Sequence, residues 1–192
     1  MAAVCKPGTG TARPPCRWHH AGLGSLLGLL LGLSQPAQAA RYLDPSLRFT
    51  LELPPGWQVR RHPPGAPAEN AVRLRPPKRT DRDRGLVRID VWSRPALSGA
   101  GLQRYLAGIG REGDAMRVRR KPTGPGLPYW VEYRIGAYAS DGQWQVERRL
   151  EGVYLSQRQL WTLRCVAAES EFRRYRRMLE SACLSFAPPG GR

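Results

Sequence analysis

The feature that most constrains this chain is a set of alternating segments joined by very short connections. The segment 129–138 alternates apolar and polar side chains, and the segments 144–155 and 160–167 follow it after turns at 140–142 and 156–158. Alternation with period two is typical of a strand that is buried on one face. A parallel crossover needs a dozen or more residues, so connections this short predict an antiparallel meander.

Four shorter segments are also predicted as strands. In the segment 47–53, leucine and phenylalanine alternate with polar residues, which predicts the first strand of a sheet with one wet face. A short strand is expected around Val72 and Leu74, another at 86–92, and another at 116–119. Together with the meander, these segments make most of the chain's regular structure β.

Two amphipathic helices complete the predicted architecture. Ser98 is a suitable N-cap for a helix that ends before Gly110, and a second helix begins at Glu169. The apolar residues of these helices recur at intervals of three and four: Leu102, Tyr105, Leu106, Ile109; Phe172, Tyr175, Leu179, Ala182 and Phe186. We therefore predict an α+β fold, an antiparallel β-sheet with helices packed on it.

Two polar stretches, 62–67 and 76–85, are rich in proline or charge and are expected to be exposed loops. Asp81 and Asp83 superficially resemble the start of a calcium loop. Gly85 and Trp92, however, stand where such a loop needs its third oxygen ligand and its glutamate. A charge-balanced loop is therefore the preferred interpretation of 81–85.

The first 39 residues have the pattern of a secretory signal peptide. Lys6, Arg13 and Arg17 precede an apolar run at 21–34, and Ala37-Gln38-Ala39 supplies small residues for cleavage. An uncleaved membrane anchor is the alternative, but it needs about 20 apolar residues. We expect residues 1–39 to be removed and 40–192 to form a single exported domain, in a thylakoid lumen or a periplasm. The whole chain has a net charge of +16, and the mature part stays strongly basic because the signal holds only three basic residues.

The cysteines and the histidine limit the chemistry of the mature chain. Cys165 and Cys183 remain after export and fall on the apolar stripes of a strand and of the last helix, so either a disulfide or two buried thiols is compatible with the pattern. We favour the disulfide slightly. His62 lies between other loop residues with no visible orienting partner, and no phosphate loop or metal-ligand spacing is present. We expect no enzymatic activity, no catalytic residue and no metal ligand.

Arginine supplies nearly all of the basic excess and occurs in clusters along the chain. The planar guanidinium group of arginine can donate two parallel hydrogen bonds to one carboxylate. These clusters therefore indicate docking on an acidic protein surface. A solvated basic face without a partner is equally compatible, anionic lipid is a weaker alternative, and export argues against nucleic acid. The candidate partner-binding residues are Arg60, Arg61, Arg79, Arg82, Arg84, Arg119, Arg120, Lys121, Arg148, Arg149, Arg173 and Arg174.

Several motifs, taken in their order along the chain, resemble the PsbP family. They are Tyr42-Leu43-Asp44-Pro45, Leu53-Pro54-Pro55-Gly56-Trp57, Tyr129-Trp130-Val131-Glu132-Tyr133, Glu147-Arg148-Arg149-Leu150, Gln159-Leu160-Trp161-Thr162-Leu163 and Ser185-Phe186. The likeness covers nearly the whole mature chain. It departs from the family where Arg148-Arg149-Leu150 replaces the usual Arg-His before leucine, and the segment between Trp92 and Tyr129 matches poorly.

The resemblance implies an α/β/α sandwich and an extrinsic protein of the thylakoid lumen. Family members bind the lumenal side of photosystem II, support oxygen evolution by helping to retain calcium and chloride, or assist photosystem assembly. The hypothesis is therefore a non-enzymatic protein, peripherally associated with the membrane, that binds lumenal photosystem II subunits. Calcium is implied by the resemblance alone. The alternative is a periplasmic domain of the same fold that binds a ligand or assists envelope assembly.

Overall fold

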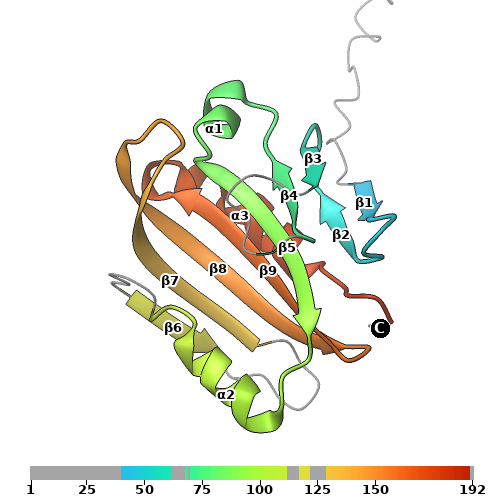
Figure 1. Cartoon of the computed structure of the whole chain (residues 1–192). Helices are drawn as coiled ribbons and strands as arrows, with labels where there is room; N and C mark the ends of the chain where they lie inside the picture. Colours follow the sequence, from blue (N-terminus) through green and yellow to red (C-terminus); the bar gives the residue numbers. More distant parts are fainter. Residues whose placement is uncertain (1–39, 62–67, 69, 112–116, 122–128, 191–192) are drawn as a thin grey trace, which may run out of the picture. The chain divides into compact units, whose positions relative to one another are not determined.

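A computed structural model describes residues 40–61, 68, 70–111, 117–121 and 129–190 of the chain. Its main feature is one antiparallel sheet in which β7, β8 and β9 form the predicted meander (Figure 1). In spatial order the strands are β3 (Gln58–Arg61), β4 (Val72–Arg75), β5 (Val87–Pro95), β9 (Gln159–Ala168), β8 (Trp144–Ser156), β7 (Tyr129–Tyr138) and β6 (Arg117–Lys121). The prediction of an antiparallel sheet is confirmed.

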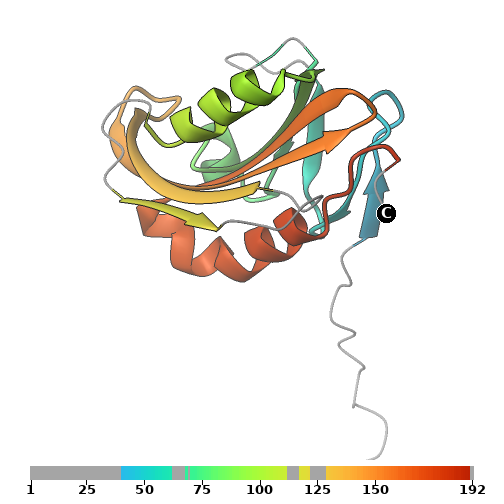
Figure 2. The same ribbon diagram turned by 90° about the horizontal axis from the view of Figure 1, so that it is seen from below.

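The two predicted helices lie on opposite faces of this sheet (Figure 2). Helix α2 (Gly99–Gly108) begins at Ser98, whose Oγ accepts a hydrogen bond from the backbone N–H of Gly101. Leu102 and Leu106 pack it against the apolar part of β7 and β8. Helix α3 (Glu169–Leu184) packs on the other face, against β8 and β9. The α+β class, with helices on both faces of the sheet, is confirmed.

The face that α3 covers carries an aromatic core. Phe186, just beyond α3, lies with its ring centroid 4.9 Å from that of Tyr154 and 5.6 Å from that of Phe49. Gly152 leaves room for Trp130 in this layer, since a Cβ on the glycine would lie 2.7 Å from the Trp130 ring. Bulky side chains from distant segments therefore fill this face of the sheet.

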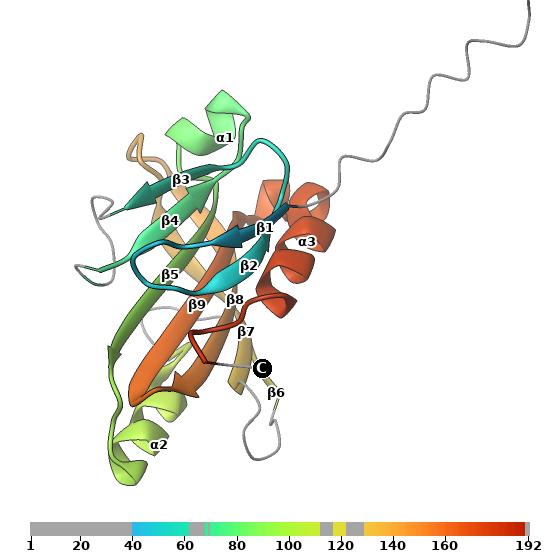
Figure 3. The ribbon, with the colours of Figure 1, turned by 90° about the vertical axis from the view of Figure 1, so that its right-hand side faces the viewer.

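The first predicted strand is shorter than expected and belongs elsewhere. Strand β2 (Thr50–Leu53) pairs with β1 (Ala40–Leu43) in a two-stranded sheet beside α3, separate from the large sheet (Figure 3). The carboxylate of Asp44 accepts hydrogen bonds from the backbone N–H groups of Ser46 and Leu47. This turn, with Arg48 at φ +61°, delays the start of the strand.

The predicted exposed loop at 76–85 was also wrong in part. It contains a short helix, α1 (Arg79–Asp83), whose Asp81 is buried. The Asp81 carboxylate accepts a 2.8 Å hydrogen bond from Tyr175 of α3 and forms a 2.8 Å ion pair with Lys78. Tyr175, 94 residues further along the chain, therefore fixes the position of this charged segment. The sequence of the segment itself does not indicate this contact.

Candidate functional site: the polar face of the sheet

The sheet face on the α2 side carries a row of charges that alternate in sign. The strand register places Arg73 of β4 opposite Asp90 of β5, Asp90 opposite Arg164 of β9, and Arg164 opposite Glu151 of β8. Residues directly opposite one another share a face of the sheet. The Nε atoms of Arg73 and Arg164 lie 2.6 and 2.7 Å from Asp90 and Glu151, respectively. We call this side the polar face.

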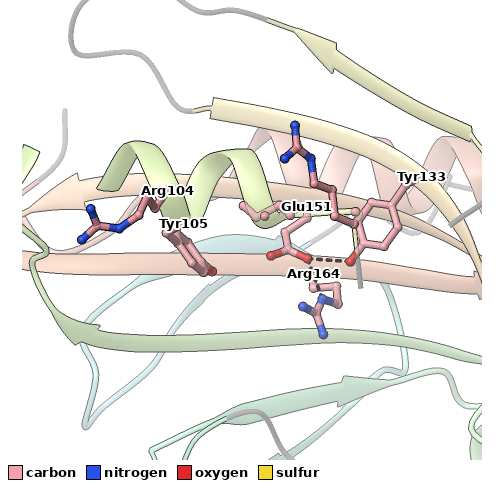
Figure 4. Close-up of a pocket in the computed structure, with 9 residues that line it drawn as sticks. Arg104, Tyr105, Tyr133, Glu151 and Arg164 are labelled. Carbon is pink, nitrogen blue, oxygen red and sulfur yellow. Dashed lines mark hydrogen bonds and ion pairs between the residues drawn. The ribbon is translucent and has the colours of Figure 1, made fainter. Parts of the chain in front are cut away.

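A cavity of about 270 Å³ opens between α2 and the polar face (Figure 4). Arg104 and Tyr105 approach it from α2, while Tyr133, Glu151 and Arg164 come from the sheet. Glu151 is only 1% exposed, and it accepts hydrogen bonds from the Tyr133 hydroxyl at 2.9 Å and from Arg164. The floor of this cavity is thus an internally satisfied polar cluster.

The ionisation of this cluster follows from its burial and its charges. Burial raises the pKa of Tyr133 to about 12, and the neighbouring Glu151 carboxylate adds to the rise. Burial alone would lower the pKa of Arg164, but the charge of Glu151 outweighs it and raises that pKa above its ordinary value. At neutral pH the cluster holds a protonated tyrosine and a closed ion pair. Such groups brace the sheet but supply neither a free base nor an activated nucleophile.

A second charged cluster lies further along the polar face. Arg88 donates to the buried Glu147 carboxylate through two nitrogens, at 2.8 and 3.1 Å, and Arg149 donates at 2.7 and 2.9 Å. Burial alone would raise the pKa of Glu147, but the positive charges of Arg88 and Arg149 outweigh it and hold that pKa below its usual value. Glu147 is therefore a carboxylate saturated by two guanidinium forks.

The fold was compared with known proteins. The solution structure of cyanobacterial PsbP (CyanoP) from Synechocystis sp. PCC 6803 matches with a TM-score of 0.50 and 16% identity, over 86% of this chain and 98% of that one. The fold is PsbP-like. No family model and no curated protein matches the chain.

Two further structures match at lower TM-scores. One is LpqN, involved in cell envelope biogenesis of Mycobacterium tuberculosis, with a TM-score of 0.47 and 12% identity over 79% of this chain and 91% of that one. The other is a protein from Bacteroides thetaiotaomicron VPI-5482, with a TM-score of 0.49 and 8% identity over 79% of this chain and 48% of that one.

Calcium, which the PsbP resemblance implies, does not fit the described part of this PsbP-like chain. No group of three or more histidine, cysteine, aspartate or glutamate side chains gathers among the described residues. The buried carboxylates of Asp81, Asp90, Glu147 and Glu151 are each held by a cationic side chain. A calcium ion needs several free oxygen ligands, and these carboxylates are already engaged.

The structure brings some of the predicted partner-binding residues together and separates others. Arg60, Arg82, Arg84 and Arg149 line cavities on the polar face, and Arg79 on α1 is ion-paired with Asp83. On the other side of the sheet, Arg61 binds Asp44, Arg148 binds Glu132, and Arg173 and Arg174 are exposed on α3. Arg119, Arg120 and Lys121 lie in β6 at the edge of the sheet. The side chains of these three residues, like all of residues 1–39 and 62–67 with His62, lie outside the described residues.

Sequence reasoning missed the carboxylates and arginines that organise the polar face. Arg88, Asp90, Glu151 and Arg164 occupy the positions between buried apolar residues, where a solvated side chain was expected. The sequence offered one usable signal: Glu151 and Arg164 carry opposite charges and lie on segments that were predicted to be neighbouring strands of the meander.

None of the helices in the described ranges is long and apolar enough to cross a membrane.

Cys165 and Cys183 meet between β9 and α3. Their Cα atoms lie 6.7 Å apart, within the span of a disulfide, and their sulfur atoms are in bonding contact. Pairing in the exported protein stays a prediction.

Proposed function

We propose that this protein is a non-enzymatic, exported docking protein that binds an acidic protein surface through the outer face of α3. The resemblance to cyanobacterial PsbP supports a photosynthetic setting for this proposal, in which the partner is the lumenal side of photosystem II. There the protein supports oxygen evolution or photosystem assembly as a peripheral component. The observation that carries this proposal is the asymmetry between paired and unpaired charges described next.

Among the described residues, the buried carboxylates form ion pairs within the chain, whereas several exposed arginines form none. Asp44, Asp90, Glu147 and Glu151 are nearly inaccessible to solvent and are held by arginines of the same chain. On α3, by contrast, Arg173, Arg174 and Arg177 are exposed and form no ion pair with a described residue. An acidic partner would therefore meet guanidinium groups that no internal carboxylate neutralises.

The position of α3 suits such docking. The helix covers one face of the sheet (Figure 2), and its apolar stripe packs against β9. Arg173, Arg174 and Arg177 are exposed to solvent. Tyr175 and Leu179 are buried in the core, so the outer arginines can change without disturbing the packing. Docking through exposed charges is steered electrostatically and weakens as salt is added.

The experiment is a binding assay with photosystem II membranes that have been stripped of extrinsic proteins. We expect the mature protein to bind at low ionic strength. It should be released at about 1 M salt, because the Debye length there is about 3 Å and charges further apart are largely screened from one another. The variant Arg173→Glu/Arg174→Glu should lose binding. Arg104→Glu/Arg111→Glu, an equal charge change at two exposed arginines on and just after α2, is the matched control and should bind normally.

Each other outcome contradicts the proposal. Binding that survives high salt, or equal loss in both variants, would argue against docking through α3. Retention by a bacterial envelope fraction with no binding to photosystem II would instead support the alternative of an envelope module.

A further inference from the structure

The polar face carries a cavity whose positive charge exceeds what the surrounding carboxylates neutralise. The cavity has a volume of about 220 Å³, and five arginines from four elements line it. They are Arg60 of β3, Arg73 and Arg75 of β4, Arg82 of α1 and Arg88 of β5. Asp83, at the exposed end of α1, is its one lining carboxylate among the described residues. We call this site the arginine cradle.

Three of these arginines are already bound. Arg73 is paired with Asp90, Arg88 with Glu147, and Arg82 with Asp83. Arg60 and Arg75 have no hydrogen bond or ion pair with a described residue, and the Nε of Arg75 is fully buried without an acceptor. Buried donors nearly always have a hydrogen-bond partner, and the described residues supply none for the Nε of Arg75.

The backbone forces these like charges together. The register sets Arg60 directly opposite Arg73, and Arg75 follows Arg73 by two residues on the same face. Like charges directly opposite in a sheet are destabilising. In agreement, burial lowers the pKa of Arg75, and the repulsion of Arg60 and Arg82 adds to the lowering. The fold therefore keeps an unfavourable arrangement that a bound anion would relieve.

The geometry points to a binding site for a phosphate-type oxyanion in the arginine cradle, with Arg60 and Arg75 as its ligands. A dianion suits two unneutralised guanidinium groups better than a single carboxylate does, because a phosphate group carries about two negative charges near neutral pH. Ser140, exposed at the rim, offers a hydroxyl that forms no hydrogen bond with a described residue.

The ligand is either free phosphate or the phosphoryl group of a small molecule. A neighbouring cavity of about 290 Å³ shares Arg73, Arg88 and Ser140 with the cradle and offers room for an organic remainder. The site lies across the sheet from the α3 arginines. Anion binding at this site therefore does not depend on docking through α3.

The experiment is calorimetric titration of the mature protein, at low ionic strength in chloride, with inorganic phosphate and with glycerol phosphate. We expect one site per chain, and the tighter of the two titrants identifies the source of the phosphoryl group. Arg75→Gln and Arg60→Gln should each weaken binding by about tenfold or more, the loss of a charge-assisted hydrogen bond. Arg41→Gln, an exposed arginine on β1, is the matched control and should bind as the wild type does.

Thermal unfolding separates a ligand role from a structural one. Without phosphate, Arg75→Gln should raise the melting temperature, because it removes repulsion; with phosphate, only the wild type and Arg41→Gln should gain stability. Three results would overturn the proposal: no heat with either titrant, equal binding of acetate, or phosphate binding by Arg60→Gln as tight as that of the wild type. Because Arg60 is exposed and forms no ion pair with a described residue, its variant keeps the test valid if Arg75→Gln fails to fold.

Discussion

The two faces of the large sheet bury different kinds of side chain. On the α3 side, aromatic and aliphatic residues such as Phe49, Trp161 and Leu163 fill the layer, and two cysteines meet in it. On the polar face, Glu147 and Glu151 are as deeply buried, the first held by Arg88 and Arg149 and the second by Arg164. Burial on the first side is driven by removing apolar surface from water, whereas on the second the burial of these two carboxylates is tolerable because each is paired with arginine.

The largest expected effect comes from breaking that pairing at Glu151. Glu151→Ala leaves Arg164 and the Tyr133 hydroxyl without their acceptor, so we expect a loss of about 3–5 kcal/mol in the free energy of unfolding, measured by urea denaturation. The double variant Glu151→Leu/Arg164→Met should recover most of this loss, because no unpaired charge remains. Equal instability of the single and double variants would show that the ion pair is not the cause.

A somewhat smaller loss is expected on the α3 side if the cysteines are bonded. A bridge that closes a loop of 18 residues stabilises by about 3 kcal/mol in the chain-entropy model. Cys165→Ala/Cys183→Ala should lose about that much, and a reductant should destabilise only the wild type. Titration of two free thiols in denaturant, without reductant, would contradict the disulfide.

Acid should distinguish the two faces through Glu147. Its pKa is lowered in the folded protein, so its contribution to stability is full above the unfolded value of about 4.3 and is lost as the pH falls below it. Unfolding measured from about pH 6 to pH 2 should show a steeper loss for the wild type than for Glu147→Gln. Parallel curves would mean that this ion-paired carboxylate does not couple stability to pH.

The smallest effect is expected where an ion pair is exposed. Arg134 of β7 lies 2.7 Å from Glu169 at the start of α3, and both side chains are partly accessible to water. Arg134→Ala should change the free energy of unfolding by only about 0.2–1 kcal/mol, by the same urea assay. A loss comparable with that of Glu151→Ala would remove the distinction between buried and exposed pairs.

Much of the fold was predictable because its signals are local. The meander and both helices follow from apolar spacing and from turns within a few residues, and they are confirmed. The alternation in 47–53 predicted a strand, but it could not indicate that this strand pairs with β1 outside the large sheet, because alternation carries no information about the partner strand. Helix α1 was missed because Asp81 owes its burial to Tyr175, far along the chain.

The candidate site was less predictable than the fold. Arginine clusters were visible in the sequence, but clustering along the chain does not say which side chains share a face. Arg60 and Arg75 converge only because β3 and β4 pair in one register, and Arg88 joins them from β5. Neither the arginine cradle nor the buried pair of Glu151 and Arg164 has a signature within one segment.

The sequence by itself determined the class of elements, their order and the strong excess of arginine, because periodicity and composition are properties of short stretches. The tertiary structure alone decided which charges are neutralised and which stay free, because ion pairing depends on strand order and register between distant segments. The alternation predicts that this face of the sheet is exposed to water. In the structure it is a covered layer of ion-paired charges, and the arginine cradle lies at one end, where Arg60 and Arg75 form no ion pair with a described residue.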